Sequence, residues 1–177
     1  MSDDTPGGSR QPVALQLRRP VEADHGPIVA LVDEWWGGRR LHDLLPRLWF
    51  QHFVGTSWVA ETADRRLAGF LVGFISPDRP DEAYIHMVAA NPNLRRQHVG
   101  RTLYDAFFAD VAKRGVRRVG AITWPGNRQS VAFHTAMGFR IVDGPGTQPI
   151  YGVVAYPDYD APDEDRTVFV REILSID

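Results

Sequence analysis

The chain has 177 residues, of which 44% are hydrophobic and 11% aromatic, so one domain with a proper hydrophobic core is expected. Its net charge of −2 argues against a general nucleic-acid-binding protein, because such proteins depend on a strong excess of Lys and Arg. The absence of cysteine excludes disulfide bonds and zinc–thiolate sites.

The chain is expected to begin with a tail and then to alternate strands and helices. Residues 1–12 are polar, acidic and glycine-rich, which predicts a disordered tail and not a signal peptide or an anchor. A soluble, cytoplasmic protein without a membrane partner is therefore expected, with one domain over residues 13–177. Alternating apolar and polar residues predict a strand over Val13–Arg19. A helical pattern then starts at Pro20 and stops at Gly37.

The middle of the chain is rich in predicted strands. Leu41–Phe53 predicts a second helical region, which Pro46 interrupts. Three strands are predicted next, over Ser57–Glu61, Leu67–Ser76 and Ala83–Ala90. The second of these is nearly all apolar, so it is expected near the centre of a sheet.

A long amphipathic helix is predicted from about Gln97 to Arg114, because apolar residues recur there every four positions. The segment from Asp143 to Arg166 is rich in proline and predicts loops. Runs of strands mixed with helices indicate an α+β or α/β domain with one mixed sheet. The remaining predicted elements are a short helix over Asn127–Met137 and strands over Arg117–Thr123, Phe139–Val142 and Thr167–Leu174.

The segment NPNLRRQHVGRTL, residues 91–103, joins a predicted strand to the long helix. The first turn of a helix has N–H groups without intrahelical partners and carries the positive end of the helix dipole, so a diphosphate can lie across it. Arg95, Arg96 and Arg101 add positive charges and forked donors. Taken alone, arginines near a helix start more often belong to a solvated surface than to a phosphate site. A Walker-type nucleotide site is excluded, because the pattern GxxxxGK[ST] is absent.

Two linked motifs resemble those of the GCN5-related N-acetyltransferases, the GNAT family. In HMVAANPNLRRQHVGRTLYDAF, Arg95 and Gly100 take the first and last positions of the family's pattern Arg/Gln-x-x-Gly-x-Gly/Ala. His98 stands where the family prefers its first glycine. The second motif, NRQSVAFHTAMGF, follows in the same order, and the resemblance covers about Leu15 to Leu174. Its matching residues are Asn127, Ser130, His134, Gly138 and Phe139.

The resemblance implies an α+β fold of three layers, α/β/α. One mixed, mostly antiparallel sheet of about seven strands would be combined with four helices and would splay between strands 4 and 5. It also implies acetyl-CoA as the acyl donor and no metal. The pantetheine arm would pair with the edge of the fourth strand, and the pyrophosphate would lie on the amides that begin the long helix. The residues implied to bind the cofactor are Met87, Val88, Ala89, Ala90, Arg95, Arg96, Gln97, His98, Val99, Gly100, Arg101, Asn127 and Ser130.

By this resemblance the protein would transfer the acetyl group of acetyl-CoA to a primary amine, by direct attack in a ternary complex. The alternative is a CoA-binding sensor or interaction domain without turnover, which the departures at His98 and His134 keep open. If His98 has right-handed helical angles, its side chain points outward and costs little. It would then be a surface residue or a donor to a phosphate oxygen. Loss of cofactor binding is the third alternative.

Three residues are candidates for proton chemistry. The family often has a tyrosine at the position of His134 that protonates the departing thiolate, so His134 is the candidate general acid; alternatively, it holds pantetheine or a backbone carbonyl in place. His86 and Glu82 are candidate bases, unless a water chain does this work. Strand alternation places His86 on one face with Tyr84 and Val88, and Met87 on the other.

The acceptor is not identified from the sequence. Trp35 and Trp36 are candidates to wall a pocket for an apolar or cationic group, although core packing or plain surface exposure explains them as well. The acidic stretch 158–165 would attract a basic acceptor or would simply be solvated. The resemblance is compatible with a small molecule or a peptide amine as partner and with a homodimer.

Overall fold

Seven strands form one mixed sheet in the computed structural model, which describes residues 13–38 and 40–173. The strand order is β1-β2-β3-β4-β5-β9-β6, and every neighbouring pair is antiparallel except β4 with β5. This confirms the expected α+β fold with a mostly antiparallel sheet. The tail expected at residues 1–12 lies outside the described residues. The strands are β1 Leu15–Arg18, β2 Trp58–Thr62, β3 Leu67–Ile75, β4 Glu82–Ala90, β5 Arg118–Thr123, β6 Arg140–Ile141 and β9 Thr167–Glu172.

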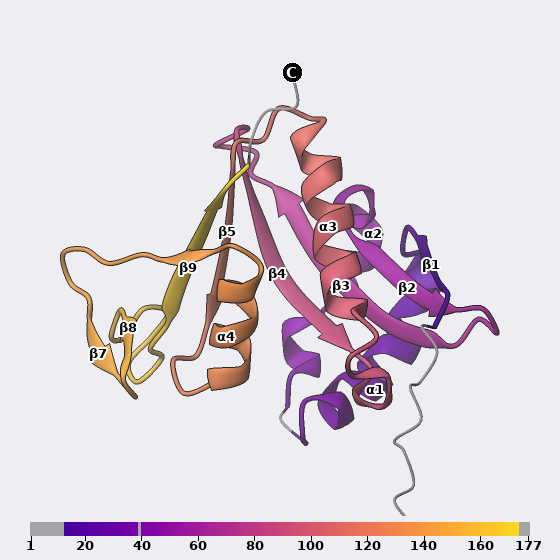
Figure 1. Cartoon of the computed structure of the whole chain (residues 1–177), viewed down its shortest axis with the longest axis horizontal. Helices are drawn as coiled ribbons and strands as arrows, with labels where there is room; N and C mark the ends of the chain where they lie inside the picture. Colours follow the sequence, from indigo (N-terminus) through magenta and orange to yellow (C-terminus); the bar gives the residue numbers. More distant parts are fainter. Residues whose placement is uncertain (1–12, 39, 174–177) are drawn as a thin grey trace, which may run out of the picture.

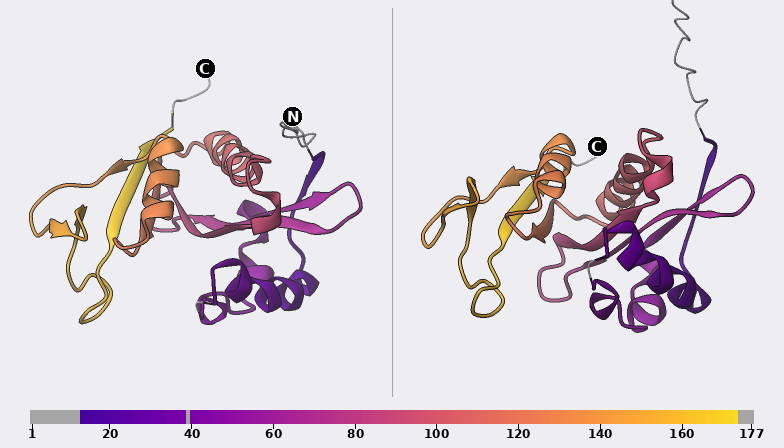
Figure 2. Two further views of the ribbon diagram at one scale, coloured as in Figure 1. Left: turned by 60° about the horizontal axis from the view of Figure 1, so that its bottom comes forward. Right: turned by 90° about the horizontal axis from the view of Figure 1, so that it is seen from below.

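Helices cover both faces of the sheet, so the expected three layers are present. Helices α3 and α4 lie on one face and α1 and α2 on the other (Figure 2). Within the described residues, no helix is both long and apolar enough to cross a membrane. The helices are α1 His25–Trp35, α2 Trp49–His52, α3 Val99–Ala112 and α4 Arg128–Ala136, with short 3-10 turns η1 Glu22–Asp24, η2 His42–Leu44, η3 Val54–Thr56 and η4 Pro92–Leu94.

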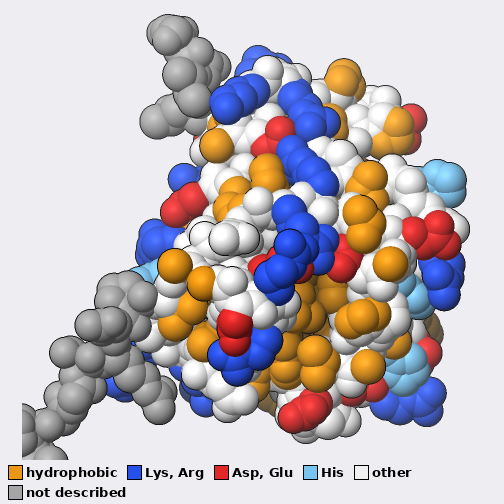
Figure 3. All heavy atoms as spheres, turned by 90° about the vertical axis from the view of Figure 1, so that its right-hand side faces the viewer, with side chains coloured by type: hydrophobic (Ala, Val, Ile, Leu, Met, Phe, Trp, Pro, Cys, Tyr) orange, Lys and Arg blue, Asp and Glu red, His pale blue; other side chains and the backbone are white. Residues whose placement is uncertain are grey.

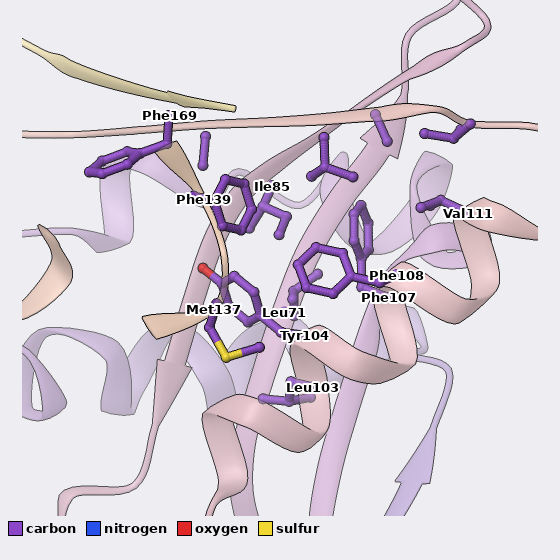
Figure 4. Packing of buried hydrophobic residues seen from close by; sticks show 14 of the residues in the cluster. Leu71, Ile85, Leu103, Tyr104, Phe107, Phe108, Val111, Met137, Phe139 and Phe169 are labelled. Atoms are coloured by element: carbon purple, nitrogen blue, oxygen red, sulfur yellow. The ribbon is translucent and has the colours of Figure 1, made fainter. Parts of the chain in front are cut away.

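Helix α3 packs its buried stripe against the middle of the sheet. The predicted stripe residues Val99, Leu103, Phe107 and Val111 are all fully buried. Tyr104 and Phe108 widen this stripe, because each lies next to a stripe residue on the helix. These rings meet residues of α4, β6 and β9 in one cluster, so α3 joins the two halves of the sheet (Figure 4).

The sheet opens between β4 and β5. Only Glu82–Tyr84 pairs with Arg118–Gly120, although β4 continues to Ala90. The Tyr84 ring lies over Gly120, where a Cβ atom would be 3.3 Å from the ring. Figure 1 shows β4 and β5 close at one end and apart at the other. The splay that the resemblance implied is therefore present, and it opens at the carboxyl ends of both strands.

A β-bulge in β4 reverses the predicted faces beyond His86. Val72 pairs with Met87 and the next residue of β3 pairs with Ile85, so His86 is the extra residue. Met87 consequently packs in the cluster under α1, and Val88 contacts the cluster under α3. The expectation that His86 and Val88 share a face is therefore wrong, because strict alternation ends at the bulge.

The predicted loop region before β9 contains a β-hairpin. Strands β7 Gln148–Ile150 and β8 Val153–Ala155 pair antiparallel as a separate small sheet. Tyr151 and Gly152 form the two-residue connection with φ of 52° and 76°. Two positive φ angles are typical of the turn that matches strand twist, but a tyrosine is unusual there. The sequence therefore lacked the usual Asn-Gly signal for this hairpin.

Ion pairs hold β1 to its neighbours. Arg18 pairs with Asp24 and Glu61 at 2.7 Å each, and Arg19 pairs with Asp110 of α3 at 2.7 Å. Figure 3 shows this side of the molecule, where Lys and Arg side chains form a row with acidic side chains beside it. Much of the positive charge of this edge is therefore used within the fold.

Candidate active site

A pocket of about 580 Å³ lies where the sheet opens. It runs from the end of α1 across the end of β4 and the 91–98 turn to α4. It brings together fourteen of the eighteen predicted site residues, although these lie far apart in the sequence. The predicted residues in its lining are Trp35, Trp36, Val88, Ala89, Ala90, Arg95, Arg96, His98, Val99, Gly100, Arg101, Asn127, Ser130 and His134.

The turn before α3 presents free backbone donors to this pocket. Among the described residues, none accepts a hydrogen bond from the N–H groups of Val99, Gly100 or Arg101. This is expected at the first turn of a helix. Asn91 shapes the turn, because its side chain accepts a hydrogen bond from the N–H of Asn93 at 2.9 Å. The helix start can therefore bind an anion with backbone groups alone.

Three arginines surround these donors. Arg95, Arg96 and Arg101 are exposed, and none of them forms an ion pair with any residue that the structure describes. Arginines without an acidic partner remain available for a phosphate. Gln97 differs from them: its side chain accepts a hydrogen bond from the N–H of Val13 at 3.0 Å and does not line the pocket.

His98 is the N-cap of α3 and has left-handed backbone angles, φ 58° and ψ 18°. The argument from right-handed helical angles therefore does not apply at this position. A positive φ is the conformation in which glycine is favoured, which explains why the resembling family prefers glycine there. Histidine is among the few other residues enriched in this region, and the turn tolerates it. Its exposed side chain lines the pocket.

Gly100 is needed for close contact between helices α3 and α4. A Cβ atom at this position would lie 2.9 Å from the Cζ atom of Phe133. Phe133 belongs to α4, so the absence of a side chain on Gly100 lets α4 approach the start of α3. The same absence leaves the backbone of the first turn open to the pocket.

The end of β4 contributes its edge to the pocket. Val88, Ala89 and Ala90 line it, and the backbone beyond Tyr84 has no pairing with β5. The Met87 side chain points the other way, into the cluster under α1, so only its backbone remains available at the strand edge. The unpaired edge offers the donors and acceptors with which an extended ligand arm can pair.

Helix α4 closes the pocket from the other side. Asn127 is its N-cap, and the Asn127 side chain accepts a hydrogen bond from the N–H of Ser130 at 3.2 Å. This hydrogen bond fixes the first turn of the helix. Asn127 and Ser130 both line the pocket, as the second motif predicted, and so do Gln129 and Ala136.

His134 is nearly enclosed, with 5% of its surface exposed. Its Nδ1 atom lies 2.8 Å from the backbone carbonyl of Ser130, to which it donates, because a carbonyl only accepts. Its Nε2 atom therefore accepts a hydrogen bond from the Tyr104 hydroxyl at 3.1 Å. The ring also stacks on Phe169 at 4.6 Å. Burial lowers the pKa of His134, and the Ser130 carbonyl opposes this shift.

His86 lies outside the pocket lining, on the face of β4 that α2 covers. Its ring stacks on Trp49, with 4.3 Å between the centroids and 16° between the planes. Its Nε2 atom lies 2.7 Å from the carbonyl oxygen of Leu44. Burial lowers the pKa of His86, and the Leu44 carbonyl opposes this shift.

Glu82 lies at the start of β4, far from the pocket. It pairs with Arg79 at 3.1 Å and with Arg118 at 3.2 Å. Six residues of extended strand separate Glu82 from Val88, which corresponds to about 20 Å. Its carboxylate ties β4 to β5 through Arg118 and does not reach the pocket, so its role as a base has no support from this geometry.

Trp35 and Trp36 end α1 at the mouth of the pocket. Both are partly buried against the cluster under α1 and both line the pocket. Gly37 and Gly38 follow with φ of 74° and 80°, which ends the helix. Both tryptophans thus line the pocket and pack against the core, and their binding of an acceptor stays a prediction.

Tyr104 and Trp49 are residues of the site that the sequence analysis missed. Each acts on a candidate histidine: Tyr104 binds His134, and Trp49 stacks on His86. The signal for Tyr104 was its position next to Leu103 in the helical stripe. Trp49 gave no such signal, because its contact with β4 joins segments that are remote in the sequence.

A sheet that splays at a helix start with free amides defines the class to which this protein belongs. The model of the Acetyltransferase (GNAT) family matches residues 27–139, and the chain belongs to this family. A curated L-2,4-diaminobutyric acid acetyltransferase from Nocardia farcinica is 32% identical over 117 residues, which are 66% of this chain and 60% of that protein. The match thus spans less than two thirds of that relative. A protein of the same name from Streptomyces coelicolor is 26% identical over 81% of this chain and 85% of its own length.

Solved structures have the same fold. Ard1 from Thermoplasma volcanium superposes with a TM-score of 0.72 at 21% identity, covering 92% of this chain and 99% of that chain. The diaminobutyrate acetyltransferase from Paenibacillus lautus, solved with its substrate and coenzyme A, has a TM-score of 0.65 at 20% identity. It covers 91% of this chain and 96% of its own. These likenesses confirm the GNAT fold that the two motifs implied.

Proposed function

We propose that the protein is an N-acetyltransferase that moves the acetyl group of acetyl-CoA to a primary amine by direct attack in a ternary complex. The observation that carries this proposal is the pocket itself. One continuous space joins the free amides of Val99, Gly100 and Arg101 to the unpaired edge of β4. A pyrophosphate at the amides and an extended arm along the strand fit these two features.

The donor would be held mainly by backbone. The pyrophosphate would accept hydrogen bonds from the first turn of α3, with Arg95, Arg96 and Arg101 adding charge. The pantetheine arm would pair with the edge of β4 between Met87 and Ala90 and would bring the thioester into the gap. Backbone N–H groups at this edge would also stabilise the oxyanion that forms during attack.

For the acceptor, the first candidate is L-2,4-diaminobutyric acid, because the curated relatives are named for it. Trp35 and Trp36 form one wall of the pocket at the end of α1. Aromatic faces suit a cationic or apolar group. A small diamino acid would enter along this wall and direct one amine to the thioester.

The chemistry requires a neutral amine. An alkyl ammonium has a pKa of about 10.4, so fewer than about one molecule in a thousand is neutral at pH 7. We assign the removal of the proton to His86, whose lowered pKa keeps it unprotonated at neutral pH. The role of His134 as general acid stays a prediction, because both of its nitrogens are engaged and burial disfavours its protonated form.

Two measurements test the proposed function. Acetyl-CoA and CoA are expected to raise the melting temperature, and acetyl-CoA with L-2,4-diaminobutyric acid is expected to release thiol. A panel of other amines and longer acyl-CoAs then defines the specificity. A melting-temperature shift with CoA but no thiol release with any amine would support the sensor alternative and overturn the enzymatic proposal.

Gly100→Glu tests the position of the anion site. The new carboxylate would face the phosphates at the helix start, so the CoA-induced rise in melting temperature is expected to disappear. Gly100→Ala separates this repulsion from crowding against Phe133, because it adds only the Cβ atom. Gly26→Glu is the matched control, since Gly26 is an exposed glycine in the first turn of α1 with nothing near its Cβ position. An unchanged shift in Gly100→Glu would remove the phosphate from this turn.

A homodimer and a cytoplasmic location, both expected from the sequence, stay predictions. Sedimentation equilibrium of the full chain tests the first. Fractionation of cells that express the protein tests the second.

A further inference from the structure

His86 is held by two groups from one segment, residues 44–49, which belongs to the layer below the sheet. The carbonyl of Leu44 lies 2.7 Å from Nε2, and the Trp49 ring lies parallel to the imidazole at 4.3 Å. His86 is also the extra residue of the β4 bulge, so it has no partner residue in β3, whereas Ile85 and Met87 do. The imidazole ring is thus held by a hydrogen bond at Nε2 and by the stacking of Trp49 on one of its faces.

The Leu44 contact determines which nitrogen of His86 carries the proton. A carbonyl oxygen only accepts hydrogen bonds, so Nε2 must be the N–H donor. A neutral imidazole has one N–H, so the lone pair of the ring resides on Nδ1. No residue that the structure describes forms a hydrogen bond with Nδ1 of His86. The base nitrogen of His86 is therefore both defined and unoccupied.

Trp49 is itself packed among other aromatic rings. Its ring contacts Phe53 at 4.5 Å and Phe74 at 6.0 Å, and Phe74 continues this aromatic cluster to Tyr84 at 5.7 Å. Trp49 excludes water from one face of His86 and so contributes to the burial that lowers its pKa. Neither charge nor titration of the neighbouring side chains is among the causes of that shift, which are burial and the Leu44 carbonyl. The titratable and charged groups on the elements and connections packed around this cluster are those of His25, Asp33, Glu34, His42, Asp43, Arg47, His52 and Tyr84.

We propose that Trp49 is a positioning residue for the acetyl transfer: with the Leu44 carbonyl, it holds His86 in the Nε2–H form and leaves Nδ1 to take the proton of the acceptor amine. This inference rests on the proposed function. The amine nitrogen forms the C–N bond, and the C–S bond breaks with its electron pair on sulfur. The amine proton passes to Nδ1 and then, through solvent, to the thiolate. The base is consequently oriented by residues 44–49, which follow Trp35 and Trp36 in the chain.

The tautomer is tested by nitrogen NMR of protein labelled with ¹⁵N-histidine, with His86→Gln used to assign the signal. The wild-type protein near pH 7.5 is expected to show a pyrrole-type Nε2 and a pyridine-type Nδ1 for His86. Trp49→Leu is expected to give averaged shifts of the two tautomers, and Trp49→Phe is expected to retain the wild-type pattern. A pyridine-type Nε2 in the wild-type protein would overturn the proposal.

Kinetics test the positioning role. Trp49→Leu is expected to lower kcat about 10- to 100-fold and to move the acidic limb of the pH profile towards higher pH, since a misplaced and better solvated base loses both geometry and burial. Trp49→Phe is expected to recover most of the rate, and the CoA-induced melting shift is expected to persist in both variants. A wild-type kcat and pH profile in Trp49→Leu would overturn the positioning role.

His25 offers a matched control for the whole segment. Its Nε2 atom binds the carbonyl of Leu45 at 3.0 Å, but it lies on α1. His25→Gln is expected to keep kcat within about twofold of wild type; an equal loss there would assign the Trp49 effect to a disordered segment and overturn the proposal. If the wild-type protein transfers acetyl to no amine, the proposed function fails, whereas the NMR result still decides the orientation of His86.

Discussion

The two sides of the splayed sheet each hold a histidine in nearly the same setting. His134, on the α4 side, donates from Nδ1 to a backbone carbonyl at 2.8 Å and stacks on Phe169 at 15°. His86, on the α2 side, donates from Nε2 to a carbonyl at 2.7 Å and stacks on Trp49 at 16°. Burial lowers the pKa of both. They differ at the second nitrogen: in His134 it is bonded to Tyr104, and in His86 it has no partner among the described residues.

Burial and a lowered pKa are common to both histidines, so they do not by themselves decide which one can act as a base. A neutral imidazole has one lone pair to offer as a base. Tyr104 uses that lone pair in His134, which ties α4 to α3. In His86 the lone pair on Nδ1 has no hydrogen-bond partner among the described residues. The hydrogen-bond partner of the second nitrogen is thus the informative observation.

The largest expected effect is on catalysis. His86→Gln is expected to lower kcat/KM by about 10²- to 10⁴-fold, because a general base is removed, while the CoA-induced melting shift persists. His134→Gln is expected to cost less turnover and more stability. Thiol-release assays and thermal melts of both variants measure this contrast. An equal or greater loss of kcat in His134→Gln at unchanged stability would reverse the comparison and make His134 the general acid.

Tyr104→Phe makes His134 resemble His86 by freeing its Nε2. The buried ring nitrogen loses its donor, so the free energy of unfolding is expected to fall by about 1–3 kcal/mol. For a domain of this size that is about 2–4 °C in Tm for each kcal/mol. Tyr151→Phe is the control, since Tyr151 is 60% exposed. Equal melting temperatures for Tyr104→Phe and the wild type would show that this hydrogen bond contributes nothing.

Stability is expected to decline with acidification through the range in which histidine titrates. The folded state resists protonation of His86 and His134, whereas the unfolded chain binds these protons near a pKa of about 6.5. Below that pH the unfolded chain therefore binds more protons, and the free energy of unfolding falls until the lowered folded pKa is passed. Urea unfolding between pH 5 and 7.5 measures this decline. His134→Gln is expected to flatten this decline, and an unchanged slope in His134→Gln would contradict the lowered pKa of His134.

The smallest effect is expected at His98, which is exposed but has left-handed backbone angles. His98→Gly is expected to stabilise the fold by less than about 1 kcal/mol, because relief of the left-handed conformation is partly offset by the entropy of glycine in the unfolded chain. Urea unfolding measures this change. CoA titration decides the side-chain role: an unchanged Kd indicates a surface residue, and a weaker Kd indicates an imidazole that donates to phosphate.

Most of the fold and most of the residues that line the pocket could be predicted from the sequence. The strand–turn–helix around Gly100 and the cap at Asn127 are local patterns, and their geometry follows from neighbouring residues. The predicted faces of β4 failed at His86, because a bulge depends on pairing with β3 and not on the sequence of β4 alone. The hairpin at Tyr151 was missed because its turn lacks the usual residues.

By itself, the sequence determined the element order, the buried stripe of α3 and a helix start suited to an anion, since these depend on periodicity and on backbone groups within a few residues. Only the tertiary structure decided what each histidine can do. Tyr104 and His134 are 30 residues apart, and His86 and Leu44 are 42 residues apart. A hydrogen bond to a ring nitrogen depends on ångström-scale placement across such distances, which packing of the sheet against its helices sets and which no local pattern encodes.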